Sequence, residues 1–163
     1  MSKTLRQSIG DLSSENMREV LRTFQSGIID TCLNAAGLAI KVGGSKLVKS
    51  VNTVNCFISG AFITKAASDM AALSGTIVDG NSNVFVFTVN AAGTLATYIG
   101  TAGATNAAVV FPVIPTGEVV LGFVMIHTVG ADFVGGTTAL DAGTVTAIYV
   151  DTGFPFNPNV DHL

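Results

Sequence analysis

The chain has 163 residues, of which 12% are charged and 48% are hydrophobic, and its formal net charge is −3 at pH 7. An ordinary soluble domain carries roughly 25% charged residues, which keep its surface in water. The mean hydropathy of +0.57 therefore predicts that the chain hides surface in a membrane, an oligomer or a larger assembly. A spanning helix needs about 20 apolar residues. The longest clean apolar run, Val119 to Ile126, is much shorter, so we expect no membrane segment.

The charges are distributed unevenly along the chain. All eight Lys and Arg residues lie within residues 1–65, and residues 66–163 contain none. Phosphate groups are bound mainly by Lys and Arg, so the sequence excludes the carboxy-terminal part from nucleic-acid binding. We therefore expect a molecule with a basic end and an acidic end, and no nucleic-acid partner. No secretory signal is visible at the amino terminus, which predicts synthesis in the cytoplasm.

Residues 12–36 have the pattern of an amphipathic helix. Ser13 or Ser14 is a candidate N-cap, and Glu15 places a negative charge in the first turn. Apolar residues follow at the spacing of one helical stripe, namely Met17, Val20, Leu21, Phe24 and Ile28. One helix with a single stripe is marginally stable alone. We expect residues 1–45 to form an N-terminal helical arm that packs on the β domain or on another copy of the chain.

Residues 46–163 are expected to form a β domain with an extended C-terminal tail. After a turn at residues 41–45, the hydrophobic period changes to two, with Gly, Asn and Asp between the apolar segments. The strands are expected over residues 54–63, 76–78, 84–89, 94–99, 109–111, 119–126 and 145–150. The first of them is expected to be buried on both faces or bent at Gly60. Residues 66–73 are expected to form one short helical turn. The fold class is thus mainly β, as an antiparallel β-sandwich or barrel-like domain with an N-terminal helical arm.

The sequence contains no recognisable catalytic, metal or cofactor site. A metal site needs clustered ligands, whereas His127 and His162 stand alone, and His127 is expected to be structural or partly exposed. Cys32 and Cys56 lack any partner spacing and are expected to be small buried hydrophobes in a reducing compartment. A serine nucleophile needs a base and an orienting acid, and no motif supplies them. We expect no enzyme activity, no cofactor and no small-molecule substrate.

The acidic residues of the β domain mostly stand beside Gly or at strand ends. Such positions are typical of carboxylates that cap turns, because Asp and Asn side chains hydrogen-bond nearby backbone. This role is expected for Asp69, Asp79, Glu118, Asp132, Asp141 and Asp151.

Three strand-and-turn segments carry a resemblance to a known family. They are residues 133–141 with 145–150, residues 109–115 leading into 119–124, and residues 86–95 with the turn from Val89 to Thr94. Together they resemble small virion structural proteins of tailed bacteriophages, among them capsid decoration (cement) and head-fibre proteins. The resemblance covers roughly residues 50–155. It implies a β domain, a symmetric oligomer that is often a trimer, and attachment to the major capsid protein.

The expected function is capsid decoration: a homotrimer, made in the host cytoplasm, that binds the major capsid protein on the outside of the head and stabilises the shell. The candidate contact residues are Met17, Arg18, Val20, Leu21, Arg22, Phe24, Ile28, Lys41, Lys46 and Lys49. Two alternatives stay open. One is a tail, collar or baseplate fibre module of the virion. The other is a binding or enzymatic domain such as a carbohydrate-binding sandwich, although the chain has no Trp and two Tyr for a sugar site.

Overall fold

The computed structural model describes residues 30–152, and within them the chain is mainly β, with no α-helix. The strands are β1 (Thr31–Cys32), β2 (Leu38–Ile40), β3 (Val48–Ser50), β4 (Val54–Ile58), β5 (Ala61–Lys65), β6 (Thr76–Ile77), β7 (Ser82–Asn90), β8 (Leu95–Ile99), β9 (Glu118–Thr128), β10 (Phe133–Val134) and β11 (Val145–Asp151). One 3-10 turn covers Asn106–Ala108. The prediction of a mainly β chain with antiparallel sheets is confirmed.

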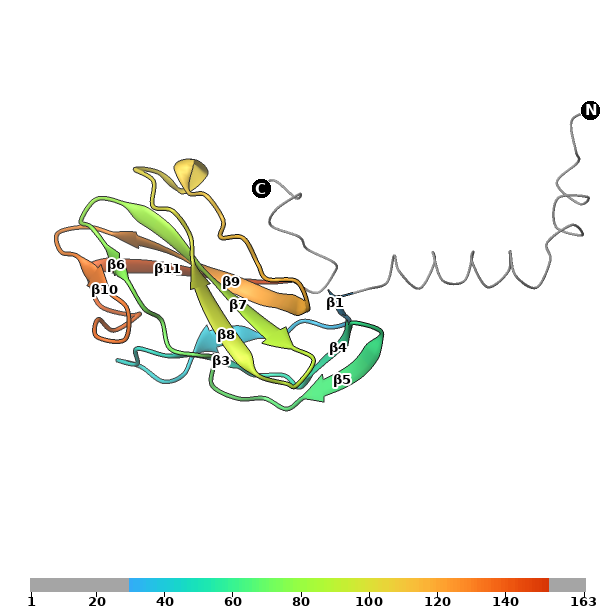
Figure 1. The fold of residues 1–163 in the computed structure, drawn as a ribbon. Coiled ribbons are helices and arrows are strands. Elements are labelled where there is room, and N and C mark those ends of the chain that lie inside the picture. Colours follow the sequence, from blue (N-terminus) through green and yellow to red (C-terminus); the bar gives the residue numbers. More distant parts are fainter. Residues whose placement is uncertain (1–29, 153–163) are drawn as a thin grey trace, which may run out of the picture.

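The largest sheet has four antiparallel strands in the order β11-β9-β7-β8 (Figure 1). The strands predicted over residues 84–89, 94–99, 119–126 and 145–150 form this sheet. β7 is buried at every position from Ser82 to Val89. A strand that is covered on both faces reads as a continuous apolar run rather than an alternating one, which explains the sequence Val84-Phe85-Val86-Phe87.

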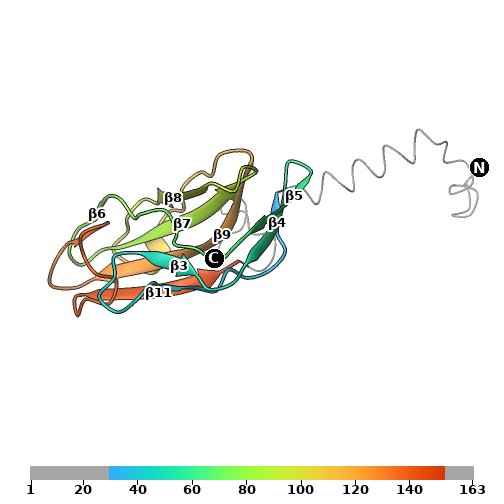
Figure 2. The same ribbon diagram turned by 90° about the horizontal axis from the view of Figure 1, so that it is seen from below.

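Short strands cover one face of this sheet, and Figure 2 views the domain from their side. They form the sheets β1-β4-β5, β2-β3 and β10-β6. The main hydrophobic core lies between these strands and the four-stranded sheet, and Phe85, Leu121 and Ile58 are fully buried in it. Phe133 from β10 packs edge-to-face on Phe85, with ring centroids 6.0 Å apart.

The segment between β8 and β9 covers the opposite face of the four-stranded sheet. Thr101 and Val110 hydrogen-bond each other through their backbones, which closes the segment into a loop. Phe111 from this loop meets Phe123 of β9 edge-to-face, at 5.0 Å between ring centroids. A second core forms here around Val84, Val86, Val120 and Phe123. The central strands are therefore buried from both sides.

The strand expected over residues 54–63 is two strands, because the chain does more than bend at Gly60: it reverses direction there. β4 and β5 form a hairpin in which Ile58 pairs with Ala61. The two linking residues, Ser59 and Gly60, have φ angles of 51° and 78°. These left-handed values belong to the tight turn that matches the twist of paired strands, and glycine adopts them freely.

The helical turn predicted over residues 66–73 is also wrong. This segment runs beside β3, where the Met70 N–H donates to the Val48 carbonyl at 2.8 Å and the Ser50 N–H donates to the Ser68 carbonyl at 2.9 Å. Backbone hydrogen bonds to a neighbouring strand thus replace those of a local helix, since tertiary pairing overrides local propensity.

The helix predicted over residues 12–36 is wrong for its last residues. Thr31–Cys32 is strand β1, and Cys32, Ala36 and Leu38 are buried in the main core. Burial of these side chains against the sheet favours extended backbone over a helix. β1 and β2 lie within residues 1–45, which were expected to form the helical arm. The remainder of that predicted helix and the predicted extended tail from residue 153 lie outside the described residues.

Candidate interaction surfaces

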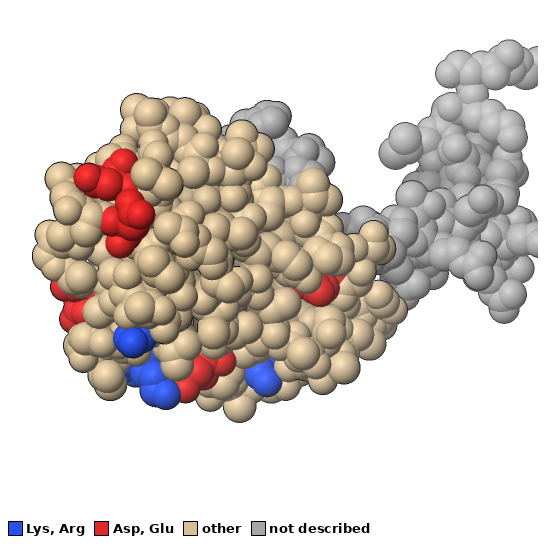
Figure 3. Space-filling view, turned by 60° about the vertical axis from the view of Figure 1, so that its left-hand side comes forward, with Lys and Arg blue, Asp and Glu red and all other residues tan. Residues whose placement is uncertain are grey.

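The surface of the described domain carries few charges and many apolar side chains. Residues 30–152 contain four lysines and no arginine, and Figure 3 shows charged side chains in small separate areas of an otherwise uncharged face. The exposed large apolar residues are Leu33, Val42, Val51, Phe62, Val78, Ile99, Val110, Val113, Val129, Val134 and Ile148. Isolated exposed apolar residues are ordinary, so the informative ones are those that share a face.

The β1-β4-β5 sheet has such a face. Its register places Cys32, Cys56 and Ile63 toward the core and their chain neighbours on the opposite side. Phe57 and Phe62 pair across the strands of that side, with ring centroids 5.5 Å apart. Phe62 is 56% exposed and Leu33 is 48% exposed. We call Leu33, Phe57 and Phe62 the outer face.

The outer face lies at an edge and at a chain entry. β5 is an edge strand, since β4 is its one ladder partner among the described residues. Edge strands offer unpaired backbone groups to another chain. β1 belongs to the same sheet and begins at Thr31, so residues 1–29 join the domain here. The apolar face and the segment with the predicted apolar stripe are therefore adjacent along the chain.

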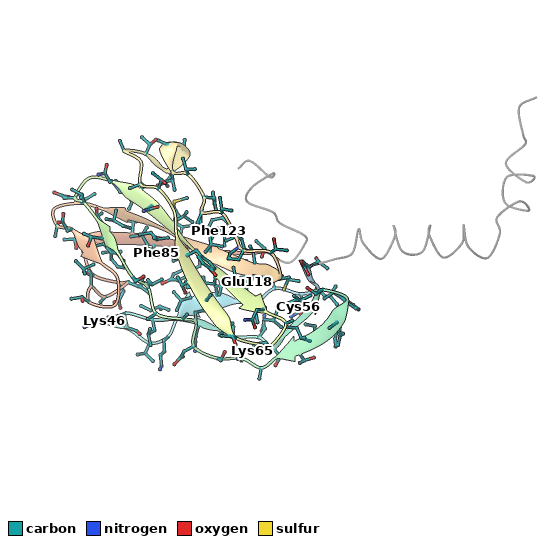
Figure 4. All side chains as sticks on the ribbon, viewed as in Figure 1. Lys46, Cys56, Lys65, Phe85, Glu118 and Phe123 are labelled. Atoms are coloured by element: carbon teal, nitrogen blue, oxygen red, sulfur yellow. The ribbon has the colours of Figure 1, made fainter. Side chains whose placement is uncertain are left out.

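The β2–β3 hairpin collects three of the ten candidate contact residues. Lys41 follows β2, Lys46 lies in the connecting turn and Lys49 lies on β3. The Lys41 ammonium forms an ion pair with the Asp69 carboxylate, with 2.5 Å between Nζ and Oδ2. Lys65, on β5, stands apart from Lys46 (Figure 4). We call Lys41, Lys46 and Lys49 the lysine hairpin.

The other seven candidate contact residues lie outside the described residues. They are Met17, Arg18, Val20, Leu21, Arg22, Phe24 and Ile28. The sequence did not predict the outer face, because it indicated at most a bend at Gly60 and not the full reversal at Ser59 and Gly60 that places Phe62 beside Phe57.

Most carboxylates of the domain hold backbone at loops and strand ends, but each binds a segment distant in sequence instead of capping its own turn, which differs from the prediction. A carboxylate that accepts a backbone N–H from another segment makes a charge-assisted hydrogen bond that holds the two segments together. Asp79 accepts the Gly130 N–H at 2.6 Å, and Asp132 accepts the Asp79 N–H at 2.8 Å. Asp141 accepts the Gly44 N–H at 2.7 Å, and Asp151 accepts the Leu38 N–H at 2.9 Å. Asp69 differs from the prediction, because its partner is the Lys41 ammonium.

Glu118 also differs, because it accepts hydrogen bonds from side chains. The Tyr98 hydroxyl donates to one carboxylate oxygen at 2.9 Å, and the Thr88 hydroxyl donates to the other. Burial, with the hydrogen bond and charge of Glu118, raises the pKa of Tyr98 above its ordinary value. The phenol is therefore a proton donor at neutral pH, and the network joins β7, β8 and β9.

A serine and a histidine meet across the central strands. Ser82 lies opposite His127 in the β7–β9 ladder, and Ser82 Oγ is 3.1 Å from His127 Nδ1. The spacing of 45 residues gave no local signal for this pair. Ser82 is 1% exposed, and no carboxylate of residues 30–152 hydrogen-bonds the imidazole ring. The imidazole nitrogen thus satisfies the hydrogen-bonding capacity of the buried Ser82 hydroxyl.

Other classes of site were sought in the same part of the chain. No three His, Cys, Asp or Glu side chains of residues 30–152 gather closely enough to hold a metal ion. No helix of that region is long and apolar enough to span a membrane. Comparisons with protein-family models, curated proteins and solved structures found no match to this chain. The outer face and the lysine hairpin are thus the two candidate interaction surfaces of residues 30–152.

Proposed function

We propose that this protein is a non-enzymatic structural component of a bacteriophage virion, which forms a homotrimer and decorates the outside of the capsid through the major capsid protein. Residues 30–152 would be the β-sandwich body of each subunit. The observation that carries the assembly role is the outer face, where Phe57, Phe62 and Leu33 stand beside the chain entry at Asp30. The virion setting is supported by the resemblance of residues 50–155 to phage structural proteins.

The partner of the outer face in this proposal is a second copy of the chain. Burying apolar surface contributes about 25 cal/mol per Å², and permanent interfaces are apolar and poor in charge at their centre. The outer face meets this description, since Phe62 and Leu33 are exposed and the adjoining Thr64 and Asn55 are uncharged. The apolar stripe predicted at residues 17–28 would extend the same contact.

The lysine hairpin would contribute to attachment on the capsid. Lys46 is exposed, and among the described residues Lys41 forms an ion pair with Asp69 alone. Complementary charge guides association more than it adds affinity, so the hairpin would orient the subunit on an acidic surface. Binding the assembled shell in preference to free subunits stabilises that shell by mass action. Repetition over the lattice adds avidity.

The proposal predicts that purified full-length protein binds undecorated capsids of its parent phage. We expect saturable co-sedimentation with the capsids and a higher temperature of capsid disruption, because ligand binding to one state stabilises that state. Part of the binding should be lost at high salt, since screening shortens the range of the lysine charges. Capsids that neither bind the protein nor gain heat resistance would contradict capsid decoration, and binding to isolated tails would support the tail module instead.

Replacement of Phe62 by Lys should weaken self-association. A charge placed at the centre of the outer face must lose water when two copies meet, and central aromatic residues carry most of the energy in many interfaces. We expect the dissociation constant of the oligomer to rise at least tenfold, as measured by analytical ultracentrifugation.

Val129→Lys is the matched control for this variant. Val129 is 63% exposed and lies between β9 and β10, at the opposite end of the domain from β5 (Figure 1). The two variants carry the same added charge, so only Phe62→Lys should change the oligomer. Equal effects of the two substitutions, or none from Phe62→Lys, would count against the outer face as the contact.

A further inference from the structure

Two free cysteines face each other in the β1-β4-β5 sheet. β1 pairs antiparallel with β4, and the register sets Cys32 opposite Cys56. Both thiols are free and buried, with 3% and 0% of the residues exposed. Both side chains lie on the core side of the sheet, and Cys56 is labelled in Figure 4 close to where β4 approaches the four-stranded sheet. Sequence spacing gave no sign of this pairing.

The hydrogen-bond pattern identifies the kind of cross-strand pair. The Leu33 N–H donates to the Asn55 carbonyl at 2.8 Å, while the Asn55 N–H donates to the Asn34 side chain at 2.9 Å. The Leu33–Asn55 bond flanks the cysteines, so Cys32 and Cys56 form a non-hydrogen-bonded pair. In such a pair the Cα atoms are about 4.5 Å apart and the side chains are close. Cysteines joined by a disulfide have Cα atoms roughly 4.4–6.8 Å apart. The backbone is therefore already placed for a bond.

The two thiols are also chemically unequal. The hydrogen bond from the Cys56 thiol lowers the pKa of Cys32, while the hydrogen bond to Cys32, together with burial, raises the pKa of Cys56. The thiolate is the nucleophile in thiol–disulfide exchange. The Cys32 thiol donates to the Asn34 carbonyl at 3.0 Å and lies on the two-residue strand β1. When β1 opens, Cys32 is the thiol that an oxidant reaches first, and Cys56 is the thiol that resolves the intermediate.

We propose that Cys32 and Cys56 form a reversible intramolecular disulfide when the protein meets a disulfide oxidant such as oxidised glutathione. The Cys32 thiolate attacks one sulfur of the oxidant and releases one glutathione thiolate. Cys56, after losing its proton, attacks the Cys32 sulfur of the mixed disulfide and releases the second glutathione. The protein loses two protons and two electrons, and oxidised glutathione is reduced to two thiols. The inference does not rest on the proposed virion role.

The bond would change how the amino-terminal segment is held. β1 has two residues and pairs with β4 alone among the described strands, and such short edge strands open easily. Opening of β1 gives the oxidant access to Cys32 despite its burial. Once closed, the disulfide fixes β1 to β4 and closes the loop of residues 33–55. Residues 1–29 are then tethered covalently to the hairpin that carries Phe57 and Phe62.

The test uses the full-length chain, purified with reductant and then incubated with oxidised glutathione. We expect the intact mass to fall by two hydrogens, and peptide mapping to show Cys32 joined to Cys56 within one chain. The Tm should rise by about 5–10 °C, because cross-linking restricts the unfolded chain, and dithiothreitol should reverse the rise.

Cys56→Ala provides the comparison, because alanine keeps a small apolar side chain in the core. In this variant Cys32 should stop at the glutathione adduct, and the Tm should not rise. Should the variant fail to fold, the peptide map of the natural chain still decides. Three outcomes of the incubation with oxidised glutathione would each overturn the proposal. They are two free thiols even in mild urea, glutathione adducts alone, or disulfides between chains.

Discussion

Replacement of Phe85 by Ala is expected to lower the free energy of unfolding by about 3–5 kcal/mol. Phe85 is fully buried on β7, and its ring packs edge-to-face on Phe133. Truncation to alanine removes the free energy gained by burying the ring. It also leaves a cavity between the four-stranded sheet and β10, and the two-residue pairing of β10 with β6 provides few neighbouring atoms that could fill it. Because domains of this size are stable by roughly 5–15 kcal/mol, the loss is a large fraction of the total.

Urea denaturation of the full-length chain, followed by circular dichroism, measures this loss. Val129→Ala is the control, since Val129 is 63% exposed and lies outside the outer face, and surface truncations usually change stability by less than about 1 kcal/mol. If Phe85→Ala does not fold, Phe85→Leu retains most of the volume and should lose about 1–2 kcal/mol. Equal losses for Phe85→Ala and Val129→Ala would contradict the placement of the main core.

The long strands could be predicted from the sequence because their signal is local. Residues 84–89, 119–126 and 145–150 are rich in β-branched and aromatic residues and are bounded by turn residues. The turn at residues 90–93 was predicted from its Asn and Gly, and there the Asn90 side chain accepts the Ala92 and Thr94 N–H groups at 3.0 Å. Where the chain obeys short-range rules, sequence and structure agree.

The second layer could not be predicted, because it depends on pairing between distant residues. β1 and β10 have two residues each, too few to show a period. β6 was predicted over residues 76–78, but its pairing with β10 spans more than fifty positions of the chain. The loop around Phe111 covers the four-stranded sheet through side-chain packing that no local pattern encodes. The opposed cysteines were missed for the same reason, since their contact follows from the register of β1 on β4.

The β1-β4-β5 sheet connects the two proposals through its two sides. Phe57 and Phe62 lie on the side away from the core, and Cys32 and Cys56 lie on the core side of the same strands. A disulfide between the cysteines would restrain β4, the strand that carries Phe57, which packs on the exposed Phe62. Oxidation would therefore restrain the positions of the side chains in the outer face without changing any of those side chains chemically.

Gly122 is a second position at which a small change should have a large effect. In the β7–β9 ladder Phe87 pairs with Gly122 and Thr88 pairs with Val120, so Leu121 is the extra residue of a β-bulge. Gly122 has φ of +154°, where L side chains are strained. A Cβ added there would lie 2.4 Å from the Val150 carbonyl oxygen and 2.6 Å from Leu38 Cδ1. The close approach of β11 and β2 thus requires glycine at this position.

Gly122→Ala is expected to lower the free energy of unfolding by about 2–4 kcal/mol, because the methyl group must displace the β11 backbone and adopt a strained φ. The measurement is urea denaturation of the full-length chain. Gly143→Ala is the matched control, since nothing lies within 4 Å of its added Cβ. Its free energy of unfolding should rise by about 0.4–1 kcal/mol, because alanine lowers the conformational entropy of the unfolded chain. A Gly122→Ala variant as stable as the natural chain would show that β11 does not pair with β9 at the bulge.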